Sequence, residues 1–144
     1  MIRICPSILN ADRNNLTSEI SKIAKSSDFL HLDVMDNIFV PNRTFDLLEC
    51  EKIIKTSSLP VDVHLMVDKP EITIGKYAEF GASSITFHLE ATSEPNKCID
   101  IVKSTGSRVG IALKPATQLS QVAQFLDLID MVLIMTVEIG RAHV

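Results

Sequence analysis

Short apolar runs alternate along the chain with longer, more polar segments whose composition suits helices. The apolar runs are rich in aliphatic and β-branched residues, as is typical of buried strands, and they recur at intervals of roughly 20–30 residues. They predict strands near residues 2–6, 28–34, 60–66, 84–88, 108–112 and 130–135. The segments between them predict helices near residues 13–26, 46–57, 71–80, 95–105 and 118–126.

This alternation of strand and helix predicts an α/β fold, in which helices cover a parallel sheet. Periodicity alone leaves open whether the sheet is doubly wound or closed as a barrel. The chain has no Gly-rich phosphate loop after its first strand, as an open sheet often has. Polar residues instead follow nearly every strand, as they do in barrels, where the carboxyl ends of the strands carry the active site. They are Ser7, His31, Asp33, His64, His88, Glu90 and Lys114.

Composition narrows the class of protein. The chain has 144 residues, of which 46% are hydrophobic, so one soluble domain with a sizeable core is expected. The net charge is −4 and no Lys/Arg cluster occurs, which argues against a nucleic-acid or anionic-membrane partner and favours a small molecule. Cys5, Cys50 and Cys98 fit neither a disulfide framework nor a zinc ribbon. A cytoplasmic location is expected.

A candidate metal site follows from two neighbouring strands. His31, Asp33 and Met35 alternate along one strand and therefore share a face, and His64 lies on the next strand. Two imidazoles and a carboxylate suit a divalent ion such as zinc, iron, manganese or cobalt, and three ligands leave a coordination position open. Buried structural histidines, and methionines that only fill the core, are the alternatives that the pattern leaves open.

The other polar residues allow two interpretations each. Ser7 is either a turn residue or a contact of the site, and Asp62 either orients an imidazole or is a buried, satisfied carboxylate. His88 and Glu90 fit a hydrogen-bonded pair at a strand end. Lys114 is either a loop charge or a group that faces an anionic substrate.

Several ordered motifs together carry a family resemblance. They are Cys5-Pro6-Ser7-Ile8-Leu9-Asn10-Ala11-Asp12, Leu30-His31-Leu32-Asp33-Val34-Met35-Asp36 with Phe39-Val40-Pro41-Asn42, and Asp62-Val63-His64-Leu65-Met66. With these motifs, the chain from Met1 to about Glu138 resembles the ribulose-phosphate 3-epimerase family of (β/α)₈ barrels. The resemblance implies interconversion of D-ribulose 5-phosphate and D-xylulose 5-phosphate through an enediolate, in the pentose phosphate pathway.

The resemblance also implies roles for individual residues. One divalent metal ion would be held by His31, Asp33 and His64. Asp33 would also be one of two acid/base carboxylates. Substrate contacts would come from Ser7, His64, Met35, Met66 and Met135. Asn37 stands where the family usually has Gly, and Asn tolerates the left-handed backbone that such a Gly often adopts.

The last six residues, Ile139-Gly140-Arg141-Ala142-His143-Val144, resemble nothing in the family and match the translation of a sequencing adapter. Residues 1–138 are therefore expected to form the N-terminal part of a barrel, with about six strands and five helices. The second acid/base Asp, a further metal ligand and the phosphate-binding loops would be missing, so this piece is expected to be inactive. The whole protein is a candidate homo-oligomer.

Two other functions remain as alternatives at this stage. One is a hexulose-6-phosphate 3-epimerase of the same barrel superfamily, which would differ mainly in the length of its sugar. The other is a short binding protein without catalytic activity. The intact set of His31, Asp33 and His64 argues against the second alternative, because metal ligands have no use in such a protein.

Overall fold

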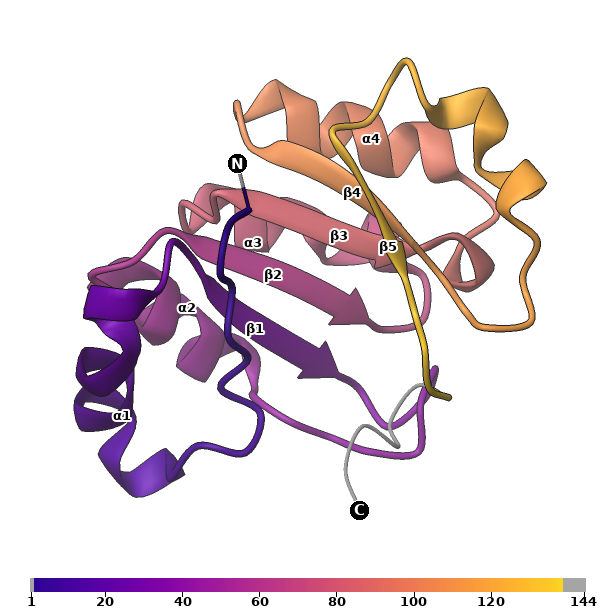
Figure 1. Ribbon diagram of the computed structural model, residues 1–144. Helices are drawn as coiled ribbons and strands as arrows, with labels where there is room; N and C mark the ends of the chain where they lie inside the picture. The colour runs from indigo at the N-terminus through magenta and orange to yellow at the C-terminus, as the bar shows by residue number, and fades with distance from the viewer. Residues whose placement is uncertain (1, 139–144) are drawn as a thin grey trace.

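The computed structural model describes residues 2–138, which form a curved parallel sheet with helices on its outer side (Figure 1). The sheet has five strands in the order β1-β2-β3-β4-β5. The last six residues, 139–144, which were expected to be unrelated to the family, lie outside the described residues. The strands are β1 (Leu30–Met35), β2 (Val61–Met66), β3 (Ser84–His88), β4 (Arg108–Leu113) and β5 (Met131–Ile134).

Four α-helices lie among the described residues, and each falls within or close to a predicted range. They are α1 (Leu16–Ile23), α2 (Leu47–Thr56), α3 (Ile74–Glu79) and α4 (Pro95–Ser104). The start of α2 shows how local chemistry sets a boundary. Asp46 accepts a hydrogen bond from the Glu49 backbone N–H at 2.8 Å, and the Glu49 carboxylate accepts one from the Asp46 backbone N–H at 2.8 Å. This capping box satisfies N–H groups that the first turn leaves free.

The predicted strand at residues 2–6 is wrong, although the segment does lie beside β1 (Figure 1). The N-terminal segment and β1 are joined by a single parallel bridge, between Ser7 and His31. Pro6 accepts a hydrogen bond from His31 N but has no N–H of its own to donate. The N–H of Ile4 is taken by the side chain of Asp28. Because these two donors are lost, no regular ladder forms.

The predicted helix at 118–126 is also wrong. This segment forms two 3₁₀ turns, Leu119–Gln121 and Ala123–Phe125. Val122 and Phe125 are its buried apolar residues, and they are three positions apart. A spacing of three matches the period of a 3₁₀ helix, so these two anchors hold the segment against the core without a full α-helical turn.

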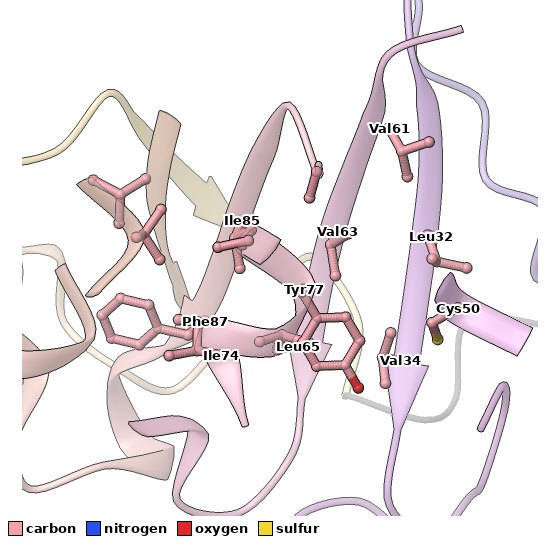
Figure 2. Close-up of a cluster of buried hydrophobic side chains, with 14 of the residues drawn as sticks. Leu32, Val34, Cys50, Val61, Val63, Leu65, Ile74, Tyr77, Ile85 and Phe87 are labelled. Carbon is pink, nitrogen blue, oxygen red and sulfur yellow. The ribbon is translucent and has the colours of Figure 1, made fainter. Parts of the chain in front are cut away.

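The two faces of the sheet have opposite character. The outer face, which packs against the helices, is apolar: Figure 2 shows Leu32, Val34, Val63 and Leu65 of the strands beside Tyr77 of α3. We call the opposite face the inner face. It carries the intervening residues of each strand, many of which are polar although buried. The prediction of a parallel α/β sheet is confirmed, and within residues 2–138 the sheet remains an open part of a barrel.

A glycine on the inner face provides a test of this packing. Gly110 of β4 is paired with Thr86 of β3. A Cβ at position 110 would overlap with the hydroxyl of Thr86 and lie 3.2 Å from Cε of Met131. Overpacking of this kind costs about 1–3 kcal/mol. Gly110→Ala should lower the free energy of unfolding of the whole protein by about that amount in urea denaturation.

Gly75→Ala in α3 is the matched control, since a Cβ there would lie 3.4 Å from Cγ2 of Ile101, an ordinary contact. In a helix this change should be neutral or stabilise by up to about 1 kcal/mol. Equal losses in the two variants would contradict the close approach of Gly110 and Thr86.

Candidate metal centre

The pairing of β1 with β2 brings the predicted metal ligands together. Asp33 is the register partner of His64, and His31 is the register partner of Asp62. Alternate residues of a strand share a face, so all four side chains lie on the inner face. They are also largely withdrawn from solvent: Asp33, Asp62 and His64 are buried and His31 is half-buried.

The three predicted ligands meet at one carboxylate oxygen. Nε2 of His31 lies 3.2 Å from Oδ1 of Asp33, and Nδ1 of His64 lies 3.0 Å from the same oxygen. Ligand atoms of the three residues all lie within 4.8 Å of one another. Atoms bonded to one metal ion at about 2.0–2.2 Å lie roughly 3.0–3.6 Å apart, depending on geometry. The donor set and its spacing therefore fit a divalent metal ion.

Electrostatics at this cluster favour positive charge. Burial alone raises the pKa of Asp33, but hydrogen bonds from His31 and His64 outweigh burial and hold that pKa well below its usual range. Burial alone lowers the pKa of His31, but hydrogen bonds to Asp33 and Asp62 outweigh it and raise the pKa to about 12. Asp33 is thus a carboxylate at neutral pH, and the cluster attracts a cation.

Asp62 orients the imidazole of His31. Its Oδ2 lies 2.8 Å from Nδ1 of His31, and its Oδ1 accepts a hydrogen bond from Ser84 Oγ at 2.5 Å. A carboxylate on the far nitrogen fixes the ring of a ligating histidine. Cys5 also has its sulfur within 4.8 Å of ligand atoms of His31 and Asp62. Because both oxygens of Asp62 are already hydrogen-bonded, we interpret this second group as support for His31.

Ser7 contacts the other oxygen of the central carboxylate. Its hydroxyl donates a hydrogen bond to Oδ2 of Asp33 at 2.5 Å and accepts one from the Leu9 backbone N–H at 3.1 Å. The bridge between Ser7 and His31 holds the hydroxyl at this position. Ser7 is therefore part of the cluster as well as a turn residue, which joins the two interpretations that the sequence left open.

The three methionines form an apolar group at the carboxyl end of the strands. Met35 and Met66 are register partners and are buried, and Met135 packs against them. Val40 and Phe39, from the loop after β1, and Leu9 complete the cluster. The loop turns sharply at Asn37, whose φ of 62° is the left-handed conformation expected at this position. The methionines lie next to Asp33 and His64 along their strands.

Sequence reasoning underestimated His88. We expected a pair with Glu90, but Nε2 of His88 lies 2.8 Å from Nε2 of His64, while its Nδ1 lies 3.4 Å from Glu90. The side chain is fully buried, and burial lowers its pKa. The ring of Phe39 lies 5.4 Å away, centroid to centroid. The position of His88 at the end of β3 could have indicated this contact from the sequence, because the ends of neighbouring strands converge in a barrel.

Glu90 joins the ends of β3 and β4. Its Oε1 accepts hydrogen bonds from the Lys114 backbone N–H at 2.7 Å and from Thr117 Oγ1 at 2.5 Å. The Lys114 ammonium lies 4.2 Å from the ring centroid of Phe39, a cation–π contact. In this structure Lys114 thus steadies the loop that covers His88.

Comparison with solved structures supports the fold. A mutant tryptophan synthase alpha-subunit of Pyrococcus furiosus superposes with a TM-score of 0.69 at 12% identity, and the match covers 92% of this chain and 64% of that one. The alpha-subunit from Legionella pneumophila superposes with a TM-score of 0.59 at 11% identity, over 92% of this chain and 62% of that one. Together with the inner-face cluster, these matches define the class: part of a TIM barrel with a candidate His/Asp metal centre.

Comparison of sequences gives the family. The model of the ribulose-phosphate 3 epimerase family matches residues 3–142, so the chain belongs to this family. A protein of Mycobacterium leprae named ribulose-phosphate 3-epimerase is 44% identical over 137 residues, which are 95% of this chain and 61% of the relative. Ribulose-phosphate 3-epimerase 1 of Cupriavidus necator is 43% identical over 140 residues, 96% of this chain and 58% of the relative. The chain thus spans about three fifths of the length of these relatives.

Glu90 generates a prediction about pH. Burial alone raises its pKa, but contacts with His88, Thr117 and the Lys114 backbone outweigh burial and lower the pKa to about 2. A lowered pKa in the folded state means that the Glu90 charge stabilises the fold above the ordinary value of 4.5. This contribution is lost as the pH falls from there towards about 2.

Glu90→Gln should therefore be less stable than the wild type at neutral pH, and the difference should shrink on acidification through this window. Chemical denaturation at a series of pH values measures it. Glu79→Gln, at an exposed site on α3, is the control. A difference between wild type and Glu90→Gln that does not change with pH would contradict the assignment.

Proposed function

We propose that the whole protein is a ribulose-phosphate 3-epimerase, which interconverts D-ribulose 5-phosphate and D-xylulose 5-phosphate. One observation carries the proposal: in a chain that belongs to this family, the β1–β2 register gathers His31, Asp33 and His64 around one point of the inner face. Relatives that carry this enzyme name match over 95–96% of the chain. The proposal concerns the whole protein, because the chain spans about three fifths of those relatives.

In this proposal Asp33 moves the proton. Epimerisation removes a proton from the carbon beside the ketone on one face and returns one on the other face. Oδ1 of Asp33 is directed at the two histidines, and Oδ2, which accepts the Ser7 hydroxyl, is the oxygen that exchanges a proton with the substrate. Its low pKa keeps Asp33 in the basic form. We infer from membership of the family that the opposing carboxylate lies on a later strand of the barrel.

His31, Asp33 and His64 would hold one divalent ion, which we propose to be zinc, iron, manganese or cobalt. When bound, such an ion stabilises the negative charge that develops on the substrate oxygens during proton removal. Met35, Met66 and Met135 would contact the substrate and exclude water without offering a competing proton. Ser7 and His64, which contact the two different oxygens of Asp33, would also contact the substrate.

The remaining parts of the proposal concern partners and location. The partner is a small sugar phosphate, and the acidic composition without a basic cluster argues against nucleic acid. No helix within residues 2–138 has the length and apolar character needed to cross a membrane. We propose a cytoplasmic enzyme of the pentose phosphate pathway, and homo-oligomerisation of the whole protein.

Loss of a proposed ligand should remove metal and activity together. In the whole protein, His64→Ala should lower both the bound metal, measured by elemental analysis, and the epimerisation rate to near background. Thr86→Val is the matched control, since Thr86 is the register partner of His64 on β3 and its hydroxyl has no hydrogen-bond partner among the described residues. A His64→Ala protein with its full metal content would refute the ligand assignment.

The role of Asp33 as a base calls for a separate measurement. Removal of a general acid/base costs about 10²–10⁴-fold in rate. Asp33→Asn, reconstituted with saturating metal, should lose kcat for epimerisation on that scale and should no longer exchange with D₂O the C3 proton of the epimer that Asp33 deprotonates, while the opposing carboxylate can still exchange that of the other epimer. Exchange of both epimers at the wild-type rate in a metal-loaded variant would show that another group is the base.

A further inference from the structure

His88 connects a proposed metal ligand to a carboxylate at the rim of the sheet. Its Nε2 lies 2.8 Å from Nε2 of His64, and its Nδ1 lies 3.4 Å from Oε2 of Glu90. We propose that His88 accepts a hydrogen bond from His64 in the metal-loaded protein, and that Glu90, the charged neighbour of His88, holds the proton of His88 on Nδ1. In this arrangement, which we call the relay, His88 and Glu90 are positioning residues that fix the orientation and tautomer of His64. The inference rests on the proposed metal centre and adds residues that act on it through His64.

In the metal-loaded protein, the position of the proton on His64 follows from the nitrogen that would bind the ion. Nδ1 of His64 lies 3.0 Å from Oδ1 of Asp33, so Nδ1 is the nitrogen that faces the centre. A ligating imidazole is neutral, and the nitrogen that binds the metal carries no proton. Without the ion, Nδ1 donates to Asp33. With the ion bound at Nδ1, the single proton of His64 would be on Nε2, and this N–H points at His88.

The tautomer of His88 then follows as well. Two nitrogens 2.8 Å apart require one donor and one acceptor, because two N–H groups aimed at each other would repel. Since His64 donates, Nε2 of His88 accepts, and the proton of neutral His88 is on Nδ1. Among the described residues Nδ1 has no hydrogen-bond partner, and Oε2 of Glu90 at 3.4 Å is its charged neighbour.

Glu90 is fixed in a way that suits this role. Its Oε1 accepts hydrogen bonds from the Lys114 backbone and from Thr117, so Oε2 is the oxygen left to face His88. The carboxylate attracts the proton of His88 to Nδ1 and keeps the lone pair of Nε2 directed at His64. The ends of β3 and β4 thereby position a ligand on β2.

Burial explains why His88 matters. His64 is 2% exposed and His88 is fully buried, so bulk water has little access to the N–H of His64 if the acceptor is removed. A buried donor without a partner carries a penalty that rotation of the ring away from the centre would relieve. His31 differs, because Asp62 contacts it directly. The two proposed imidazole ligands are thus held by different partners, a carboxylate and a neutral imidazole.

The first experiment measures zinc affinity of the whole protein by competition with a chromogenic chelator, without substrate. His88→Phe keeps a ring but removes the acceptor, and it should weaken zinc binding about 10–100-fold, as loss of an outer hydrogen bond does in other metal sites. His88→Gln can present a carbonyl oxygen towards His64 and should restore most of the affinity. Zinc affinity in His88→Phe equal to that of the wild type would overturn the relay.

The second experiment needs no change at His88. In zinc-loaded wild-type protein, ¹⁵N NMR of the histidine side chains should show His88 protonated on Nδ1 and His64 on Nε2. Glu90→Leu should weaken zinc binding and increase the Nε2-protonated form of His88. Thr117→Val is the matched control: it removes a hydrogen bond to the same carboxylate but leaves the relay intact, so the His88 tautomer should not change.

These outcomes separate the relay from the proposed function. If His64→Ala retains its zinc, the metal centre itself is wrong and the relay is wrong with it. If His64→Ala loses zinc while His88 carries its proton on Nε2 in the wild type, the metal centre stands and the relay is refuted. Restored affinity in His88→Gln together with an Nδ1-protonated His88 supports both.

Discussion

The parallel register of β1 against β2 is the constraint on which the rest of the site depends. It pairs Asp33 with His64 and His31 with Asp62, so four ionisable side chains from two strands meet on one face. A shift of one residue would turn one strand's set towards the helices and leave charges in the apolar layer. The register is held from the outer face, where Leu32, Val34, Val63 and Leu65 pack beneath the helices (Figure 2).

The inner face of the sheet is polar in its interior, and this is costly unless each group has a partner. In this structure each carboxylate has several polar partners. Asp33 accepts a hydrogen bond from Ser7 and lies beside two histidines, and Asp62 is hydrogen-bonded to both His31 and Ser84. Among the described residues two buried polar atoms have no hydrogen-bond partner, Oγ1 of Thr86 and Nδ1 of His88. Both belong to β3, next to His64. Unpaired buried polar atoms are therefore found on the side of the cluster where β3 lies beside the candidate metal centre.

The loops at the carboxyl ends of the strands bring together residues that are distant along the chain. Phe39, from the loop after β1, lies over His88 at the end of β3 and contacts Lys114 beyond β4. Glu90 braces the same region through the Lys114 backbone and Thr117. These contacts connect the loop that carries Phe39, the pair of His64 and His88, and Glu90. They lie at the same end of the sheet as the methionines.

The sequence by itself determined the parallel α/β class, four of the helices and the faces of the strands, because hydrophobic alternation and capping chemistry are local. It also placed His31, Asp33 and His64 on one face, since side chains alternate along any strand. It failed at residues 2–6, where an apolar run resembles a strand but Pro6 and the Asp28 contact remove ladder donors. It failed again at 118–126, where tertiary anchoring of Val122 and Phe125 selects 3₁₀ turns.

Only the tertiary structure decided which partners these residues take. The sequence paired His88 with Glu90, and Nδ1 of His88 does lie 3.4 Å from Glu90. Only the fold shows that Nε2 of His88 also lies 2.8 Å from His64, 24 positions away. Likewise, Asp62 orients His31 through the register of β1 against β2, and Ser7 reaches Asp33 through the bridge at His31. Local patterns specify the face on which a side chain lies. The distance between side chains on different strands depends on register and sheet curvature, which arise from packing of the whole core.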